Sequence, residues 1–247
     1  MEERSAQMGF NPVTVNAITY IGTLAIFMVA MFVPGIKLPF PLVGCLVEWK
    51  AENFGENQNL QYFFLSLWSV HFLRRTIEVL FVHEYKRKMP LVESIGAPVY
   101  YWFFSFWNGV ALRHDNGYHQ TYLPMLVVGS LLFFTGSAGN CKCHLQLRDF
   151  RKQKRKSVLS EKSKHTLPYG FIFEYVSCPH YLFEILTWIG FLLTAWTLSS
   201  LLFLLATIAT LVTYSYKKHG AYKQEFNGQD GRELYPRNRK ALIPYIF

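Results

Sequence analysis

Apolar residues along this chain of 247 residues gather into blocks that are long enough to cross a bilayer. The blocks cover residues 13–34, 60–83, 95–112, 122–139 and 182–216. A membrane-spanning helix needs about 20 consecutive, mainly apolar residues, and the first block contains no charged residue. The pattern predicts an integral membrane protein built from α-helices.

Two segments bear on the number of helices, and the second of them leaves that number open. Block 182–216 is too long for one helix, because its 35 residues would extend about 52 Å against a hydrocarbon core of ~30 Å. We predict two short helices there, with a turn near residues 197–200. Segment 38–49 is shorter than a full crossing and suits a re-entrant or interfacial piece as well. The expected fold is an all-α bundle of six or seven transmembrane helices.

Positive charge is concentrated in three polar segments, 84–94, 140–168 and 217–240, which hold 19 of the 25 Lys and Arg residues. The predicted helices place all three on one side of the membrane, and such an excess marks the cytoplasmic side. On the simplest interpretation, these charges only set the topology and contact lipid headgroups. They lack the interleaved aromatic residues of a nucleic-acid-binding module, so no nucleic-acid partner is expected.

The four cysteines do not indicate a disulfide framework. Cys141, Cys143 and His144 lie close together, but without a second pair of ligands they are a weak metal signal. No metal site is predicted.

A polar stripe follows the fourth apolar block, in the sequence NCKCHLQLRDFR. Asn140, His144, Arg148 and Arg151 recur at spacings of four, four and three, so a helix places them on one face. Guanidinium forks bind phosphate oxygens in pairs, which suits the phosphates of a dinucleotide. A solvated basic helix has the same spacing, so both interpretations stay open.

Charges also occur inside block 60–83, where charged side chains usually face a cavity or one another. Arg74 and Glu78 are four residues apart and can pair on one helical face. The alternative is a helix end at the membrane interface, with arginines reaching toward water.

The tail KKHGAYKQEFNGQDGRELYPRNRKALIPYIF combines polar and apolar pieces. His219, Tyr222 and Lys223 lie just beyond the last predicted membrane helix, NGQDG is typical of a turn, and ALIPYIF is apolar. We expect the tail to fold back and cap a cavity from the cytoplasmic side. A loose basic tail is the alternative, which the aromatic and proline content disfavours.

The segment YVSCPHYLFEILTW interrupts the apolar sequence with polar residues at the mouth of a predicted membrane helix. Pro179 is expected to end the preceding segment, and His180, Tyr181 and Glu184 then share one face of the first helical turns. A helix N-terminus carries partial positive charge, which favours an anion or a developing oxyanion. On residue pattern alone, Tyr181 is also explained as a tyrosine of the interfacial aromatic belt.

Three sequence blocks, YVSCPHYLFEILTWIGF, GNCKCHLQLRDFR and KKHGAYKQEF with YPRNRKALIPYIF, resemble the steroid 5-alpha-reductase superfamily of membrane reductases. The resemblance covers residues 68–247 and implies reduction of a carbon–carbon double bond conjugated to a carbonyl, with NADPH as hydride donor. HFLRRTIEVLFVHEYKRKMPL and YYWFFSFWNG are most like the very-long-chain trans-2-enoyl-CoA reductases of fatty-acid elongation. We therefore expect an N-terminal membrane region at 1–60, a reductase domain at 61–247, and cytoplasmic loops that cap the cofactor cavity.

The resemblance implies roles for particular residues. Tyr181 is the expected proton donor, with Glu78 and Glu48 as acidic catalytic candidates. The residues expected to line the NADPH site are Asn140, His144, Arg148, Arg151, His180, Glu184, His219, Tyr222 and Arg239.

Two positions depart from the family pattern, since His180 stands where the family usually has Asn and Phe72 where it usually has Tyr. In the steroid branch that Tyr helps polarise the 3-oxo group, so Phe72 argues against a steroid ketone as substrate. The alternatives are a steroid or polyprenol reductase, or a membrane homologue without catalytic activity.

The resemblance also sets expectations for partners and location. It implies an acyl-CoA substrate, a lipid bilayer around the helices, and other fatty-acid elongation enzymes as neighbours. The expected location is the endoplasmic reticulum membrane, with the basic loops and the C-terminus in the cytoplasm.

Overall fold

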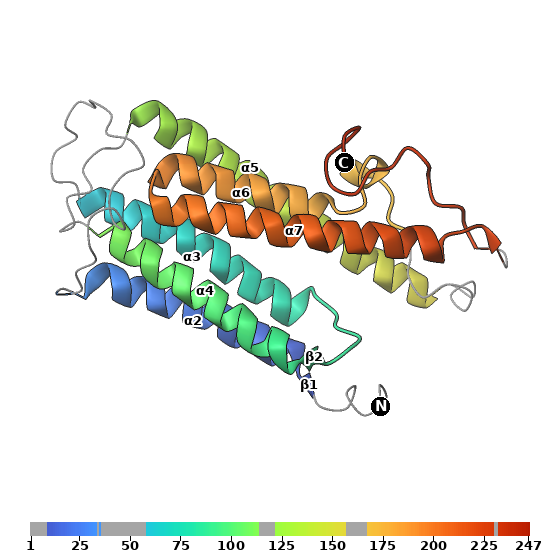
Figure 1. Cartoon of the computed structure of the whole chain (residues 1–247), viewed down its shortest axis with the longest axis horizontal. Coiled ribbons are helices and arrows are strands. Elements are labelled where there is room, and N and C mark those ends of the chain that lie inside the picture. The colour runs from blue at the N-terminus through green and yellow to red at the C-terminus, as the bar shows by residue number, and fades with distance from the viewer. Residues whose placement is uncertain (1–8, 34, 36–57, 114–121, 157–166, 230–231) are drawn as a thin grey trace. The chain divides into compact units, whose positions relative to one another are not determined.

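The computed structural model describes residues 9–33, 35, 58–113, 122–156, 167–229 and 232–247. These residues form six α-helices: α2 (Pro12–Phe32), α3 (Gln58–Phe81), α4 (Leu91–Ala111), α5 (Leu123–Lys156), α6 (Pro179–Ala195) and α7 (Leu198–Glu225) (Figure 1). A 3-10 turn (η3, Phe171–Glu174) precedes α6, and two-residue strands β1 (Gly9–Phe10) and β2 (Met89–Pro90) pair antiparallel. The expected all-helical class is confirmed for this part of the chain.

Each predicted apolar block corresponds to a helix, and the long last block is divided as expected. The backbone of Trp196 is in the left-handed region, with φ of 46°. Residues other than glycine seldom adopt this conformation. Thr197 then caps the new helix, since its Oγ accepts a hydrogen bond from the Ser200 backbone N–H at 3.2 Å. A strained residue followed by a Thr cap therefore breaks the apolar run.

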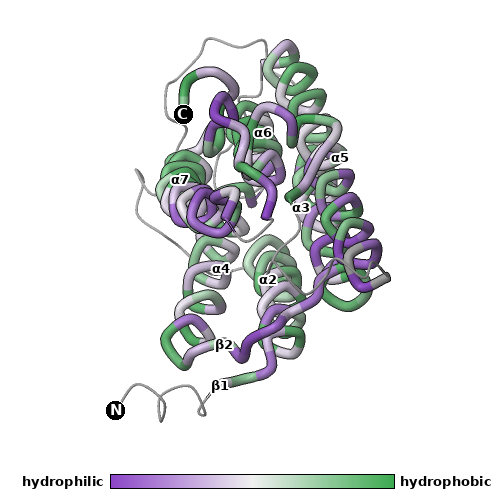
Figure 2. The backbone as a smooth tube through the Cα atoms, turned by 90° about the vertical axis from the view of Figure 1, so that its right-hand side faces the viewer, coloured by the Kyte–Doolittle hydropathy of each residue, from purple (hydrophilic) through white to green (hydrophobic). Residues whose placement is uncertain are grey.

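Within the described part of the chain, three helices, α2, α5 and α7, are long and apolar enough to cross a membrane. Isoleucine and valine side chains on α2, at residues 18, 21 and 29, are 54–56% exposed, as expected for a surface in contact with lipid. Helices α5 and α7 both continue beyond their apolar blocks, to Lys156 and Glu225, with hydrophilic residues toward their C-terminal ends (Figure 2). The chain is a multi-pass membrane protein.

Two compact units make up the chain, and each is described by itself. The first contains the described residues up to Ser130 together with Phe191–Phe203, and the second contains Leu131–Gly190 with Leu204–Phe247. Both units are discontinuous in sequence, because α6 and α7 each contribute to both. The expected boundary at residue 60 stays a prediction.

Aromatic side chains form the core of the first unit. Phe27 of α2 stacks on Trp68 of α3, with ring centroids 4.6 Å apart. Trp68 also contacts Phe191 and Phe203 at 5.3 Å and 5.9 Å. Burial of several large rings supplies most of the packing energy in such a core.

Glycine lets α5 and α6 approach closely in the second unit. A Cβ atom on Gly136 would lie 2.5 Å from the Thr187 backbone nitrogen, and one on Gly139 would collide with the Phe183 ring. Small residues at helix contacts are a common means of helix association in membranes. The close approach brings the polar stripe of α5 alongside the first turns of α6.

The C-terminal tail folds back onto the segment that precedes α6, as expected. Val176 and Lys240 form a parallel β-bridge. The Ser177 N–H donates to the Lys240 carbonyl at 2.8 Å, and the Cys178 N–H donates to the Ala241 carbonyl at 3.1 Å. These bonds fix the entry to α6 within the second unit.

Candidate functional site

The first turn of α6 begins at the predicted residue. Pro179 occupies the first helical position, where the missing N–H costs no hydrogen bond. The Tyr181 and Leu182 N–H groups both donate to the Cys178 carbonyl, at 3.1 Å and 3.4 Å. His180, Tyr181 and Glu184 therefore lie at the N-terminal end of the helix, as the sequence predicts.

Asn140 ties the stripe of α5 to the start of α6. Its side-chain amide donates to the His180 carbonyl at 2.7 Å, and the side chain is almost completely buried, with 2% exposed. The His144 and His180 ring centroids lie 5.7 Å apart, and those of His180 and Tyr181 lie 4.2 Å apart. Four predicted residues from two helices thus form one contact group.

The other predicted residues of α5 and α6 contact their own helices. Glu184 accepts a hydrogen bond from the Trp188 indole N–H at 3.0 Å. Arg148 binds Asp149 at 3.1 Å, and the Arg151 Nε–H donates to the Leu147 carbonyl at 2.9 Å. Both arginines are partly exposed, so their guanidinium groups remain accessible at one end of the polar stripe.

A second polar group forms where the end of α7 meets the tail. Ser177 Oγ lies 2.7 Å from His219 Nδ1 and 2.5 Å from the Tyr235 hydroxyl. Tyr222 stacks near Tyr235, with ring centroids 6.3 Å apart. His219 and Tyr222 lie in the last turns of α7, which continues to Glu225.

Arg239 packs against the same tyrosine from the tail. Its guanidinium lies 5.5 Å from the centroid of the Tyr235 ring and 5.9 Å from that of Tyr169, and one of its N–H groups donates to the Pro168 carbonyl at 3.1 Å. The Nε atom is buried without a hydrogen-bond partner among the described residues. A buried guanidinium with a spare donor suits a phosphate or carbonyl oxygen of a ligand.

Burial also controls the ionisation of the tail tyrosine. Removal from water raises the pKa of Tyr235, and this effect outweighs the charge of the nearby Arg239 guanidinium, which lowers it. Tyr235 is therefore a neutral hydroxyl at physiological pH. Sequence reasoning missed both Ser177 and Tyr235 as site residues, although both lie inside the quoted motifs.

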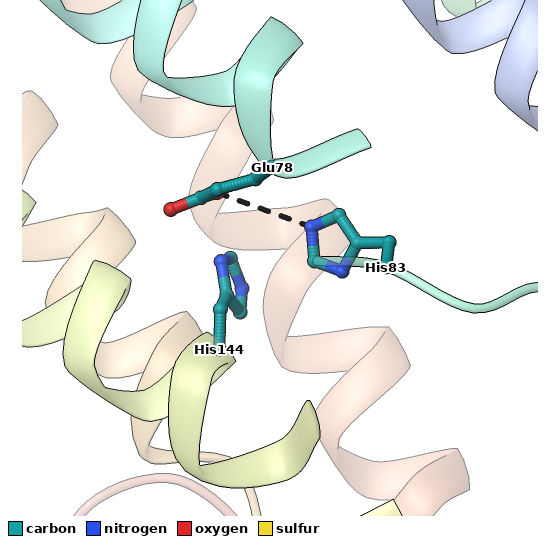
Figure 3. Close-up of side chains that lie close together, drawn as sticks. All are labelled: Glu78, His83 and His144. Atoms are coloured by element: carbon teal, nitrogen blue, oxygen red, sulfur yellow. Dashed lines mark ion pairs between the residues drawn. The ribbon is translucent and has the colours of Figure 1, made fainter. Parts of the chain in front are cut away.

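Glu78, a predicted catalytic candidate, is part of an ion-pair cluster in the first unit. It lies 2.5 Å from Arg74 and 2.6 Å from Arg75, so the predicted pair with Arg74 is confirmed and a second arginine joins it. Nε2 of His83 lies 3.9 Å from the same carboxylate (Figure 3). The carboxylate is therefore paired with two guanidinium groups. Glu48 lies outside the described residues.

Phe72 is completely buried in the aromatic core of that unit. Its ring centroid lies 5.0 Å from that of Trp68 and 5.8 Å from that of Tyr101. The side chain of residue 72 is therefore part of an apolar core and carries no hydroxyl group.

The second unit holds the kinds of donor group that proteins use to bind a dinucleotide. Amide, imidazole, guanidinium and hydroxyl groups gather around the start of α6 and the folded-back tail, and such groups bind phosphates, ribose hydroxyls and a carboxamide. The predicted NADPH site stays a prediction; its residues are Asn140, His144, Arg148, Arg151, His180, Glu184, His219, Tyr222 and Arg239.

Comparison with known proteins agrees with this chemistry. A family described as 3-oxo-5-alpha-steroid 4-dehydrogenase matches residues 87–247, so the chain belongs to that family, the steroid 5-alpha-reductases. Members of the family are NADPH-dependent reductases of carbon–carbon double bonds.

Among its relatives is the very-long-chain enoyl-CoA reductase of Dictyostelium discoideum, 32% identical over 74% of this chain and 57% of the relative. The 3-oxo-5-alpha-steroid 4-dehydrogenase 1 of Rattus norvegicus is 28% identical over 74% of this chain and 66% of its own length. Polyprenal reductase 1 of Arabidopsis thaliana is 29% identical over 75% and 64%. The chain thus spans 57–66% of the length of these relatives.

Proposed function

We propose that this protein uses NADPH to reduce the trans-2 double bond of long-chain enoyl-CoA. The observation that carries the proposal is the contact group at the start of α6, where Asn140 holds the His180 carbonyl at 2.7 Å and the Tyr181 ring lies beside His180. A phenol is thereby placed at a helix N-terminus, within the unit that holds the cofactor candidates.

Tyr181 acts on the developing charge of the substrate. When bound, NADPH would supply a hydride to C3 of the enoyl thioester, and the thioester oxygen of the substrate would then carry the negative charge of an enolate. The Tyr181 hydroxyl donates a hydrogen bond to that oxygen, its proton then passes to C2, and water returns a proton to the tyrosinate that is left. The partial positive charge at the N-terminus of α6 favours the same anion. Preorganised donors of this kind are typically worth roughly 3–4 kcal/mol each.

The apolar and polar parts of the substrate are expected to bind in different parts of the protein. An acyl chain is as apolar as lipid and enters between helices, whereas CoA and NADPH are polyanions that need the basic side. We propose a bundle of six or seven spans with cytoplasmic loops over the cofactor. The protein lies in the endoplasmic reticulum membrane beside other elongation enzymes, and its basic loops and C-terminus face the cytoplasm.

Two observations favour enoyl-CoA over a steroid ketone. The identity to the enoyl-CoA reductase, 32%, exceeds the 28% to the steroid enzyme. In addition, Phe72 offers no hydroxyl to polarise a 3-oxo group, and its ring is packed into an aromatic core.

A substrate panel tests the proposal. Purified protein is given long-chain enoyl-CoA, a 4-en-3-one steroid and a polyprenol substrate in turn, while NADPH absorbance is followed. Oxidation with enoyl-CoA is expected, and oxidation with only one of the other lipids would assign that branch instead. A membrane homologue without activity would oxidise no NADPH and gain no thermal stability from it, although a ligand at 100 times its Kd should add about 2.7 kcal/mol.

Tyr181→Phe tests the proton donor. We expect turnover with enoyl-CoA to fall by about a hundredfold or more, because one donor to the developing anion is lost. Tyr175→Phe is the matched control, since Tyr175 is exposed on the same segment and should tolerate the change. Near-normal turnover of Tyr181→Phe would exclude this role.

A further inference from the structure

Ser177 Oγ is the meeting point of three polar groups from distant parts of the chain. His219 Nδ1 lies at 2.7 Å, the Tyr235 hydroxyl at 2.5 Å and the Lys240 carbonyl oxygen at 3.1 Å. The Ser177 N–H donates to the same Lys240 carbonyl. This bond holds the backbone of Ser177 against the tail. Ser177 itself is buried.

The number of protons available to these four groups determines which of them donate hydrogen bonds and which accept. A serine hydroxyl has one proton to donate and two lone pairs to accept with, whereas a carbonyl oxygen only accepts. All three contacts of Ser177 become hydrogen bonds in one arrangement, in which Ser177 donates to the Lys240 carbonyl while Tyr235 and His219 Nδ1–H donate to Ser177. The Tyr235 oxygen also lies 3.3 Å from His219 Nδ1 and accepts from the same N–H in this arrangement. If Ser177 donated to His219 instead, the contact with the Lys240 carbonyl would contain no proton.

We infer that Ser177 and Tyr235 hold neutral His219 in the tautomer with its proton on Nδ1, so that Nε2 offers a lone pair to a bound ligand. The partner of Nε2 is then a hydrogen-bond donor, such as a ribose hydroxyl or a carboxamide N–H, and not a phosphate oxygen. The identification of that ligand as NADPH rests on the proposed function. Ser177 and Tyr235 are positioning residues, because they act through His219.

The surroundings of Tyr235 support its role as a donor. Burial raises the pKa of Tyr235, so its phenol keeps its proton across the physiological range. The Arg239 guanidinium over its ring and the neighbouring Tyr222 ring hold the ring in place. The second ring nitrogen of a histidine is commonly set in this way by the hydrogen bond that the first one makes.

Nitrogen-15 NMR of histidine-labelled protein reads the tautomer directly and needs no catalysis. The His219 signals are assigned by their loss in His219→Gln. We expect wild-type protein to show a protonated Nδ1 and a bare Nε2, and Tyr235→Phe and Ser177→Ala to move the signals toward the opposite tautomer. Tyr169→Phe is the control, because it removes a hydroxyl that binds Glu233 from the other ring beside Arg239. A wild-type signal with a protonated Nε2 would overturn the inference.

Cofactor binding supplies the second measurement. NADPH affinity is measured by fluorescence titration of wild type, Ser177→Ala, Tyr235→Phe and the double variant. Each single change should weaken binding by about tenfold, and the double variant should be no weaker than the worse single one, since both act through one imidazole. Multiplied losses, or an unchanged affinity in both single variants, would refute the positioning role.

The two proposals fail in different ways. Suppose that His219 has its proton on Nδ1 but that none of the lipid substrates causes NADPH oxidation. The proposed function is then wrong, and the inference about the tautomer stands. If enoyl-CoA is reduced while His219 has its proton on Nε2, the inference is wrong and the proposed function stands.

Discussion

Replacement of Gly136 with alanine places a methyl group where α5 and α6 touch. The new Cβ would lie 2.5 Å from the Thr187 nitrogen and 2.7 Å from the Phe183 carbonyl oxygen. Both are backbone atoms, so no side-chain rotation relieves the clash. Because non-bonded atoms settle at roughly 3.5 Å, the helices must separate by about 1 Å.

That separation reaches the candidate site one helical turn away. The bond from Asn140 to the His180 carbonyl, 2.7 Å long, would lengthen beyond the ~3.5 Å at which a hydrogen bond is lost. Overpacking costs about 1–3 kcal/mol and the lost bond about 1 kcal/mol. We therefore expect the free energy of unfolding to fall by about 2–4 kcal/mol, and NADPH affinity to fall with it.

The assay compares thermal unfolding in detergent and NADPH titration for wild type, Gly136→Ala and Gly220→Ala. Gly220 is the matched control, because it is helical in the same unit and a Cβ there meets no atom within 4 Å. Alanine at that position should be neutral or stabilise the helix by up to ~1 kcal/mol. A Gly136→Ala protein with normal stability and affinity would refute the close approach of α5 and α6.

Three other expectations concern charge and ionisation. Glu78→Gln should lower the free energy of unfolding by about 1–3 kcal/mol, because two arginines lose their carboxylate; lost turnover at unchanged stability in a denaturation assay would instead indicate a catalytic role. Arg148→Ala or Arg151→Ala should raise the NADPH KM more than it lowers kcat, and should narrow the preference over NADH in steady-state kinetics; an unchanged cofactor KM in both would contradict their placement. Burial and the bond to Glu233 raise the pKa of Tyr169 from 10.0 to about 12, so its stabilising effect is complete below pH 10 and is lost as pH rises toward 12. Unfolding free energy should therefore fall more steeply over that interval in wild type than in Tyr169→Phe, and equal slopes would show that Tyr169 ionises normally.

The helices were largely predictable because a bilayer imposes a length on each apolar segment. The division of the last block follows from its excess length and from Thr197, whose side chain caps a helix. The pairing of Arg74 with Glu78 follows from spacing, since residues four apart on a helix are neighbours. In each case the signal is local, so one segment of sequence contains it.

The contacts between segments were not predictable in the same way. Periodicity places Asn140 on a polar face of α5, but it does not say that the amide meets the His180 carbonyl, because a backbone acceptor leaves no trace in side-chain pattern. The meeting of Ser177 with Tyr235 has the same character, since it depends on how the tail returns. The helix pattern likewise gave no sign that Phe72 fills an aromatic core.

The return of the tail has a consequence for biosynthesis. Lys240, whose carbonyl binds Ser177, is synthesised 63 residues later. Helix α6 can therefore enter the membrane before this contact anchors its first turn. A premature stop codon between the two segments would leave an inserted protein with its helices present and its site unfinished. Chains truncated between these two segments should therefore insert into the membrane and be degraded there. They should retain no partial activity.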